Sequence, residues 1–404
     1  MRVTVHPGSL AGCVQAPPSK SHAHRLLICA ALADGETILE GAGNSRDIEA
    51  TARCLAALGA DIRAGEEALH VRPIREIRKG AVLDCGESGS TLRFLLPLAA
   101  LLDCGATLTG CGRLPQRPNG PLIDAMRAHG ARFAGERLPL TVSGGLRGGE
   151  YHLPGDVSSQ YFTGLLLALP LLDADSELIA DTPLESAPYI DLTLSAMRAF
   201  GVAVQKTEKG FFVPGRQRYK APGRMRVEGD WSGAAFWLAA NALGSAVTVE
   251  GLQPDSAQGD RAAQTLFRPE SLDCVDVRDV PDLMPALAAV MAAVPGDHRI
   301  TGAARLRIKE SDRLCAMANV LRALGGNVEE LPDGLRIVGC DLAGGTVDGF
   351  GDHRIVMSAA ILATVCQAPV TIEGAEAADK SYPGFFEDFA ALGGKVETEP
   401  AGKG

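Results

Sequence analysis

The chain has 404 residues, of which 46% are hydrophobic and 22% charged, and its formal net charge is −10. This length exceeds what one hydrophobic core usually serves, so two domains are expected, and the apolar content argues against intrinsic disorder. The acidic balance argues against bulk attraction to nucleic acid, and the apolar runs at 161–172 and 283–295 are too short to cross a bilayer, so we interpret them as buried helices.

Ten cysteines are scattered along the chain, and none forms a CxxC pair. Metal clusters use tighter spacing, and disulfide scaffolds are short secreted chains. The N-terminal MRVTVHPGSLAG lacks an apolar core of secretory length. We therefore expect reduced, mostly buried thiols, a cytoplasmic location, and neither a metal site nor a membrane partner. Cys111, in the loop-like GCGRLPQRP, is the one thiol singled out.

An amphipathic helix that ends at a glycine and leads into a strand recurs along the chain. The spacing is about seventy residues, with one gap of about twice that length. The glycines are Gly59, Gly130, Gly201, Gly325 and Gly393. The long gap predicts a degenerate copy near SAQGDRAAQTLF, residues 256–267. Six such units predict two domains of three small α/β units each.

The segment KAPGRMRVEGD, residues 220–230, is typical of a domain boundary because it is polar and rich in proline and glycine. The strand-like start at 1–5 is expected to pair with the second half of the chain. That pairing makes one domain discontinuous. The prediction is one domain from 1–18 plus 227–404, and a second from 19–226.

The first candidate site motif is PPSKSHAHR, residues 17–25, which leads into the apolar helix LLICAALA. A helix N-terminus carries free N–H groups and partial positive charge, so basic residues there disfavour the helix. Lys20 and Arg25 suit this position if an anion lies between them. A solvated basic turn is the alternative, and for the cluster as a whole we favour an anion site.

Two further loops contain residue types that hold anions. GESGSTLR, residues 86–93, has small residues that let its backbone approach a phosphate or carboxylate, although it is neither a Walker loop nor GxGxxG. RLPQRP, residues 113–118, is a restricted loop with two guanidinium groups, which suit bidentate binding of these anions. Each loop is weak evidence by itself.

Two serine motifs follow. GDVSSQ, residues 155–160, precedes an apolar helix. One serine suffices to cap that helix, which leaves the second for a phosphate or hydroxyl group. SAPYI, residues 186–190, predicts a further small binding loop.

Asp282 lies in VPDLMP, between apolar residues and two prolines. Such a carboxylate either caps a helix, which is the more common outcome, or acts as a base with a shifted pKa.

The segment RLRIKESDRL combines two patterns. Strand-like alternation is expected to align Arg305, Arg307 and Lys309 on one face as a floor for an anion. Glu310 and Arg313 are expected one helical turn apart. A charged surface helix is the alternative.

The last motifs are GDHR, residues 351–354, and DKSYP, residues 379–383. No nucleophilic triad is evident, because His353 has no obvious serine partner. His22 and His24 are too few for a metal site.

Together, and in this order, these segments resemble the EPSP synthase family of enolpyruvyl transferases. The matching segments are SKSHAHR, GESGSTLR, RLPQRP, GDVSSQ, SAPYID, VEGD, PDLMPALA, RIKESDRL, GDHR and DKSYPG. The resemblance covers nearly the whole chain. It implies a mixed α/β fold of two domains, each of three βαβαββ repeats in an inside-out α/β barrel, with the ligand cleft between them.

The activity implied by the resemblance is transfer of the enolpyruvyl group of phosphoenolpyruvate to the 5-hydroxyl of shikimate 3-phosphate, with release of phosphate. This step belongs to the shikimate pathway to chorismate and aromatic amino acids. The hydroxyl loses its proton as it attacks C2, C3 gains a proton, and the tetrahedral adduct then loses phosphate as C3 returns its proton. No cofactor is required, domain closure around the two polyanions is expected, and a monomer is implied.

The resemblance also implies site residues. Those like the family's shikimate 3-phosphate ligands are Lys20, Ser21, Arg25, Ser158, Ser159, Gln160, Ser186, Asp282 and Lys309. Those like its phosphoenolpyruvate ligands are Lys20, Gly89, Arg117, Gln160, Arg313, Arg354 and Lys380. Asp282 resembles the proton acceptor and Glu310 a second acid–base group. Lys20 and Lys380 are candidates for the remaining proton transfers.

Three residues depart from the family's pattern. Glu87 stands where the family often has Asn beside the phosphoenolpyruvate site, which puts an unexpected negative charge there. Arg305 stands where some members have Asn near the shikimate ring, and Ser90 replaces a usual Thr.

Two alternatives remain. UDP-N-acetylglucosamine enolpyruvyl transferases share the fold and the donor, but they typically have Lys-Asn in the first motif and a loop cysteine as acid. Here Ser21 follows Lys20, and Cys111 precedes the arginine loop. A non-catalytic anion-binding homologue is the other alternative, although such decay usually removes acid–base residues.

Overall fold

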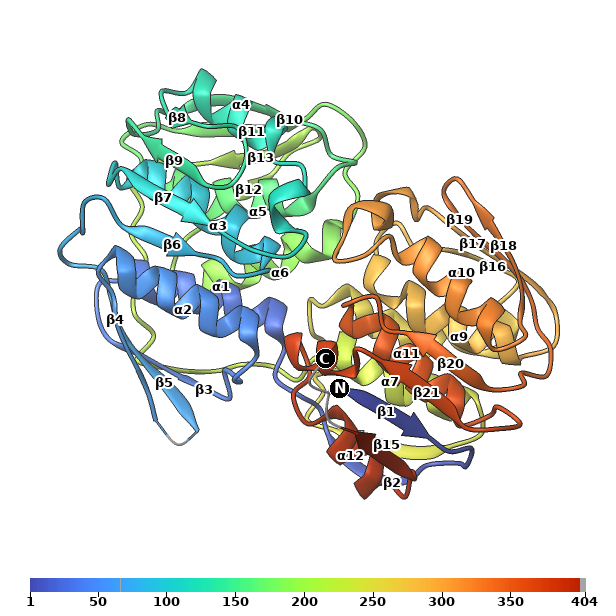
Figure 1. The fold of residues 1–404 in the computed structure, drawn as a ribbon. Coiled ribbons are helices and arrows are strands. Elements are labelled where there is room, and N and C mark those ends of the chain that lie inside the picture. The colour runs from blue at the N-terminus through green and yellow to red at the C-terminus, as the bar shows by residue number, and fades with distance from the viewer. Residues whose placement is uncertain (66, 400–404) are drawn as a thin grey trace. The chain divides into compact units, whose positions relative to one another are not determined.

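The computed structural model describes residues 1–65 and 67–399. The chain divides into two compact units, Pro18–Glu228 and a discontinuous unit of Met1–Pro17 with Gly229–Gly404. Each unit has its own hydrophobic core, and the described core residues of one are absent from the other. Both units are mixed α/β structures (Figure 1).

Three four-stranded sheets form the strand framework of the described Pro18–Glu228 unit. Their strands are β3 (Thr37–Glu40), β4 (Asp61–Ala64), β5 (Ala68–Arg72), β6 (Val82–Asp84), β7 (Ala106–Thr109), β8 (Arg132–Ala134), β9 (Leu140–Ser143), β10 (Gly149–Leu153), β11 (Ser176–Ala180), β12 (Gln205–Lys206), β13 (Gly210–Val213) and β14 (Arg224–Arg226). The orders are β14-β3-β5-β4, β6-β7-β9-β8 and β10-β11-β13-β12. In each sheet a parallel pair lies beside an antiparallel hairpin, so the three sheets repeat one plan.

Two helices accompany each of these sheets. They are α1 (Lys20–Leu32), α2 (Arg46–Leu58), α3 (Gly89–Leu101), α4 (Gly120–Ala128), α5 (Ser159–Ala168) and α6 (Ala187–Ala199). Helices α3 and α5 are apolar on nearly all sides and are buried along most of their length, where they pack on each other. Helix α1 packs on α6 and α2. The starts of α1, α3 and α5 contain three of the predicted motifs.

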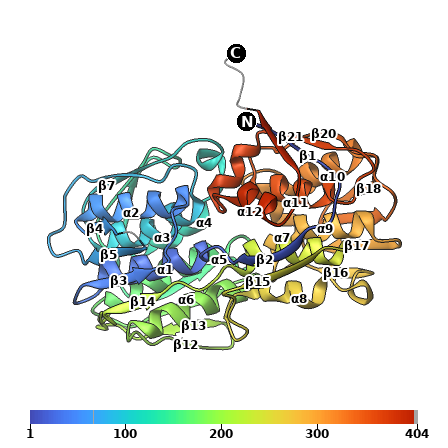
Figure 2. The same cartoon turned by 90° about the horizontal axis from the view of Figure 1, so that it is seen from below.

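The discontinuous unit repeats the plan with one reduced copy. Its strands are β1 (Arg2–Val5), β2 (Ala11–Gln15), β15 (Ala246–Glu250), β16 (Cys274–Asp276), β17 (Asp297–Thr301), β18 (Asn327–Leu331), β19 (Gly334–Val338), β20 (Gly345–Asp348), β21 (Val370–Glu373) and β22 (Val396–Glu399). The orders are β16-β17-β19-β18, β20-β21-β1-β22 and the two-stranded β15-β2. Strand β1 pairs with β21 and β22, as expected from the strand-like N-terminus, and lies beside β21 in Figure 2.

The helices of this unit are α7 (Trp231–Ala242), α8 (Ala263–Leu266), α9 (Met284–Ala293), α10 (Arg313–Ala323), α11 (His353–Ala363) and α12 (Phe385–Ala391). The 3-10 helices of the chain are η1 (Leu114–Gln116), η2 (Leu169–Leu171), η3 (Gly259–Ala262), η4 (Pro269–Ser271), η5 (Pro281–Leu283), η6 (Ala304–Ile308) and η7 (Ala375–Lys380). The reduced copy combines β15, β2 and the short α8, and α8 lies where the spacing predicted a degenerate unit.

The glycines predicted to end helices all have positive φ angles, from 77° at Gly201 to 122° at Gly59. They follow α2, α4, α6, α10 and α12. The first four precede the first strand of a hairpin, and Gly393 precedes β22, which pairs with β1. At Gly59 an added Cβ would lie 2.2 Å from the carbonyl oxygen of Glu76, so both conformation and space require glycine.

The apolar runs at 161–172 and 283–295 form the buried helices α5 and α9, as predicted. Among the described helices, none has the length and apolar character needed to cross a membrane. All ten cysteines are free thiols, but only five are buried, and Cys111 is exposed. The segment at 220–230 is not entirely a loop, because it contains β14, which pairs in parallel with β3.

Candidate functional site

The start of α1 is held by a cap and an ion pair. The hydroxyl of Ser19 accepts a hydrogen bond from the backbone N–H of His22, 3.4 Å away. The Nζ atom of Lys20 lies 3.0 Å from Oδ2 of Asp47, in the first turn of α2, and both side chains are largely buried. An anion that binds Lys20 would therefore compete with Asp47 for the ammonium group.

Arg25 is buried one turn further along α1 and fastens it to α6. Its guanidinium donates to the carbonyl oxygens of Ser21 (2.6 Å) and Tyr189 (2.9 Å) and to Oγ1 of Thr193 (2.8 Å). Burial lowers the pKa of Arg25 to about 10, so the group keeps its charge at neutral pH. These contacts hold the first turn of α6, which Ser186 precedes in a left-handed conformation.

The start of α5 joins the serine motif to the glycine motif. Ser158 caps the helix by accepting from the backbone N–H of Gln160 (3.4 Å), and Ser159 is the first helical residue. The amide of Gln160 donates to Oγ of Ser90 (3.0 Å), and its Oε1 accepts from Arg93 (2.6 Å). The prediction that one serine caps this helix is therefore confirmed for Ser158, and the binding role of Ser159 stays a prediction.

The arginine loop lies against the start of α3. An added Cβ at Gly89 would meet the Arg117 guanidinium at 2.8 to 3.0 Å, so the two residues are in contact. Arg93 donates to Oδ1 of Asn119 (3.0 Å) and to the carbonyl oxygen of Pro118 (3.1 Å), which fixes the end of the loop. The motifs at 86–93, 113–118 and 155–160 thus form one group of residues.

The discontinuous unit contains a second group, the Arg313 cluster, made of Arg313, Arg354, Asp282, Asp352 and Glu310. Arg313 is 2% exposed and Asp352 is fully buried. The Arg313 guanidinium donates to Oδ2 of Asp352 (2.9 Å), Oδ1 of Asp282 (2.9 Å) and Oε2 of Glu310 (3.0 Å). The expected Glu310–Arg313 contact is therefore present.

Arg354 approaches Asp282 from the start of α11. Its NH2 lies 2.8 Å from Oδ2 of Asp282, and its NH1 donates to the Asp282 carbonyl oxygen (3.2 Å). The two carboxylate oxygens of Asp282 are thus bound by two different arginines. Asp282 does not cap α9, so the capping interpretation is wrong: the residue lies in η5, and α9 has no side-chain cap.

Electrostatics in this cluster strongly favour ionised Asp282. Burial raises its pKa, but Arg354 and Arg313 together outweigh burial and hold the pKa well below its usual range. Burial also raises the pKa of Asp352, but the charge of Arg313 lowers it, and the pKa is lowered overall. Asp282 is therefore a weak base while both arginines contact it.

The predicted strand through Arg305, Arg307 and Lys309 is wrong, because this segment forms the 3-10 helix η6. The tight turn separates the three side chains. Arg307 pairs with Glu330, 2.6 Å away, whereas Lys309 ends η6 and contributes positive charge at Asp282.

Lys380 joins the last two motifs. It ends η7, and its Nζ donates to the carbonyl oxygen of Gly351, 2.8 Å away. Gly351 opens the GDHR segment, in which Asp352 caps α11 by accepting from the backbone N–H of Arg354. Lys380 thus lies next to the Arg313 cluster, because Gly351 directly precedes Asp352 of that cluster.

Sequence reasoning assigned no role to Asp47, Arg93 or Asp352. Asp47 had no motif of its own and is recognisable only through its contact with Lys20. Arg93 lies in the GESGSTLR segment and Asp352 in the GDHR segment. Asp352 immediately precedes the first residue of an apolar helix, which is a capping signal.

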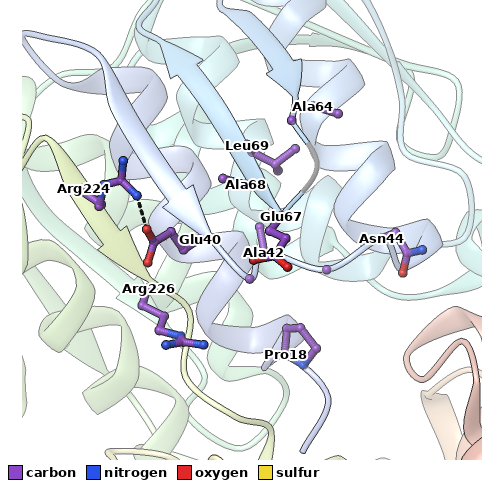
Figure 3. Close-up of a pocket in the computed structure, with 13 residues that line it drawn as sticks. Pro18, Glu40, Ala42, Asn44, Ala64, Glu67, Ala68, Leu69, Arg224 and Arg226 are labelled. Atoms are coloured by element: carbon purple, nitrogen blue, oxygen red, sulfur yellow. Dashed lines mark hydrogen bonds and ion pairs between the residues drawn. The ribbon is translucent and has the colours of Figure 1, made fainter. Parts of the chain in front are cut away.

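A pocket of about 760 Å³ occurs elsewhere in the Pro18–Glu228 unit (Figure 3). Its charged lining includes Glu40, Arg224 and Arg226, and Glu40 pairs with Arg224. None of the predicted site residues lines it.

Comparison with known proteins matches the whole chain to one family. The family model described as EPSP synthase (3-phosphoshikimate 1-carboxyvinyltransferase) matches residues 5–268 and 263–389. A protein of Clostridium kluyveri named 3-phosphoshikimate 1-carboxyvinyltransferase is 42% identical, over 99% of each chain. One of the same name from Halobacterium salinarum is 42% identical, over 98% of this chain and all of the relative. A solved EPSP synthase from Acinetobacter baumannii superposes with a TM-score of 0.82 at 25% identity, over 98% of this chain and all of that one.

Proposed function

This chain belongs to the EPSP synthase family, and from that premise we propose that it transfers the enolpyruvyl group of phosphoenolpyruvate to the 5-hydroxyl of shikimate 3-phosphate. It is a transferase of the shikimate pathway, on the route to the aromatic amino acids. The reaction is an addition followed by an elimination, which requires proton transfers and charge stabilisation but no metal or organic cofactor.

We assign the acceptor to one set of residues and the donor to another. The proposed shikimate 3-phosphate ligands are Lys20, Ser21, Arg25, Ser158, Ser159, Gln160, Ser186, Asp282 and Lys309. The proposed phosphoenolpyruvate ligands are Lys20, Gly89, Arg117, Gln160, Arg313, Arg354 and Lys380. Support comes from the contacts within each unit, where serine hydroxyls, helix starts and guanidinium groups suited to phosphate and carboxylate lie together.

The observation that supports the mechanism is that Arg313 and Arg354 each form an ion pair with a different carboxylate oxygen of Asp282. A donor carboxylate that binds both guanidinium groups would replace those contacts. Burial, the largest influence on Asp282, would then act with less opposition and raise its pKa. Donor binding would thereby convert Asp282 into a base able to accept the proton of the 5-hydroxyl.

The remaining protons balance as follows. As the acceptor oxygen bonds to C2, Asp282 takes the hydroxyl proton and C3 gains one from Glu310, Lys20 or Lys380. In the elimination the C2–O bond to phosphate breaks, C3 returns its proton to the group that supplied it, and the C2–C3 double bond forms again. The proton held by Asp282 then passes to the released phosphate or to solvent, which restores the base. Glu310 shares Arg313 with Asp282, so a donor bound at Arg313 would influence both acids.

The test is phosphate release from phosphoenolpyruvate by the purified chain, with shikimate 3-phosphate or UDP-N-acetylglucosamine as acceptor. We expect release only with shikimate 3-phosphate. Release only with the sugar nucleotide would move the chain to the alternative activity, and no release with either would point to a non-catalytic homologue.

We also propose that the chain acts as a monomer in the cytoplasm. Ten free thiols support a reducing compartment. Sedimentation equilibrium should give the mass of one chain, and a concentration-independent dimer would contradict the proposal. Cell fractionation should recover the activity with cytoplasmic markers.

A further inference from the structure

Two buried residues with no role assigned so far, Ser232 and Asp260, are linked to Arg354 by hydrogen bonds. Ser232, the second residue of α7, is 7% exposed, and Asp260, in η3, is 4% exposed. The hydroxyl of Ser232 donates to Oδ2 of Asp260 and accepts from NH2 of Arg354, 3.3 Å away. A continuous path of hydrogen bonds therefore runs from Asp260 through Ser232 to the guanidinium group.

The position of this pair is set by further contacts. Gln258, two residues before Asp260, accepts from the backbone N–H of Trp231 (3.1 Å) and donates to the carbonyl oxygen of Gly229 (2.9 Å). Both bonds tie the turn before η3 to the start of α7. The reduced repeat, which contains η3, thus supports the residues that contact the cluster.

We propose that Asp260 and Ser232 are positioning residues that orient Arg354 for the donor carboxylate. This inference rests on the proposed function, because it takes Arg354 as a donor ligand. NH2 of Arg354 is shared between Ser232 and Asp282. When the donor replaces Asp282 in that contact, the Ser232 hydroxyl still holds the guanidinium in place, and Asp260 fixes the direction of the hydroxyl hydrogen.

The charged groups that face Asp260 are Asp282, Arg354 and Asp230. Burial, followed by the charge of Asp282, raises the pKa of Asp260 to about 7, against the lowering effects of Arg354 and Ser232. Asp260 should therefore change charge within the range in which the enzyme is assayed. Its ionised form adds negative charge near Arg354 and disfavours an anionic donor, so the KM for phosphoenolpyruvate should rise above pH 7.

The experiment compares Ser232→Ala, Asp260→Ala and Asp260→Asn with the unaltered chain. Ser232→Ala and Asp260→Ala should raise the KM for phosphoenolpyruvate about tenfold, with kcat and the KM for shikimate 3-phosphate nearly unchanged. Asn keeps an oxygen that accepts from Ser232, so Asp260→Asn should restore the low KM. It should also remove the difference between pH 6 and pH 8 that the unaltered chain shows.

The matched control is Ser358→Ala. Ser358 is a fully buried serine of α11 whose hydroxyl has no hydrogen-bond partner among the described residues, so its loss should leave both KM values unchanged. An unchanged donor KM in Ser232→Ala and Asp260→Ala, or an equal rise in both KM values, would overturn the inference.

Failure of the proposed function has a different readout, which is that the unaltered chain releases no phosphate. In that case, calorimetric titration with phosphoenolpyruvate alone still tests the inference. Tenfold weaker binding by Ser232→Ala than by the unaltered chain supports it, and equal or undetectable binding in both contradicts it.

Discussion

The proton affinity of Asp282 in this structure is lower than its role in the proposed reaction demands. Two guanidinium groups hold it ionised and weakly basic, whereas proton abstraction needs a carboxylate that accepts a proton. Competition between the donor carboxylate and Asp282 for the same arginines would reconcile the two. The order of events would then be built into the site, because the base becomes effective only after the donor binds.

Replacement of this carboxylate tests that competition. Asp282→Asn should reduce kcat by about 100- to 10,000-fold, because the general base is lost. Donor affinity should persist or increase, because Asn competes less for Arg313 and Arg354. Single-turnover phosphate release and calorimetry measure the two effects. The control is Asp297→Asn, which replaces an exposed carboxylate of the same unit. Near-normal turnover of Asp282→Asn would contradict the assignment of Asp282 as the general base.

The lack of a side chain at Gly89 leaves room for the guanidinium group of Arg117. In Gly89→Ala the new methyl would lie within 3.0 Å of the Arg117 guanidinium, which must move. We expect the KM for phosphoenolpyruvate to rise about tenfold with the fold intact. Gly120→Ala is the matched control, since Gly120 also begins a helix but has no heavy atom within 4 Å of an added Cβ. Equal kinetics in the two variants would argue against a donor role for Arg117.

Asp260 should also affect the pH dependence of stability. Its pKa is raised in the folded chain from an ordinary 3.8 to about 7, so the folded state binds more protons than the unfolded state in that range. Its contribution to the free energy of unfolding therefore falls as pH rises from about 4 to about 7. Asp260→Asn should lack this fall and be at least as stable as the unaltered chain at pH 8 in urea titrations. A parallel pH profile in both proteins would contradict the expectation.

At the scale of elements, the helix starts concentrate the candidate chemistry. Helices α1, α3 and α5 begin with Lys20, Gly89 and Ser159, and each helix is mostly buried beyond its first turn. A buried apolar helix holds its first turn rigidly, and the unsatisfied N–H groups there favour anions. Helices α2, α4, α6 and α10 each end at a glycine that directs the chain into a hairpin.

The close packing of α3 on α5 depends on Gly164. An added Cβ there would lie 2.1 Å from the carbonyl oxygen of Arg93. Gly164→Ala should therefore destabilise the fold by about 1–3 kcal/mol or more, and it should disturb the Arg93–Gln160 contact. Urea denaturation measures the loss, with Gly120→Ala again as the control. Unchanged stability would show that the two helices separate at little cost.

At the scale of the whole molecule, two separate cores suggest two units of unfolding. Leu95, in α3, and Leu287, in α9, are both fully buried, each in a different core. Replacing either by Ala should cost about 2–5 kcal/mol. Calorimetry should resolve two transitions, with each variant lowering only one of them. A single transition lowered equally by both variants would show that the units unfold together.

The amino-acid sequence by itself determined the local features of this protein. Helix ends at Gly59, Gly130 and Gly201, the buried helices α5 and α9, and the strand at the N-terminus all follow from patterns within short segments. Local patterns suffice there because apolar periodicity, capping and positive φ angles depend on a few neighbouring residues. The ordered motifs also identified the family.

Only the tertiary structure decided how charges far apart in the sequence meet. The expected strand at 305–309 is the 3-10 helix η6 instead, and Arg307 pairs there with Glu330, 23 residues away. Asp282 acquired its ion pairs, rather than a capping role, from arginines 31 and 72 residues away. Asp260 gained its link to Arg354 in the same way. Ionisation depends on burial and on charges in space, which no local pattern specifies.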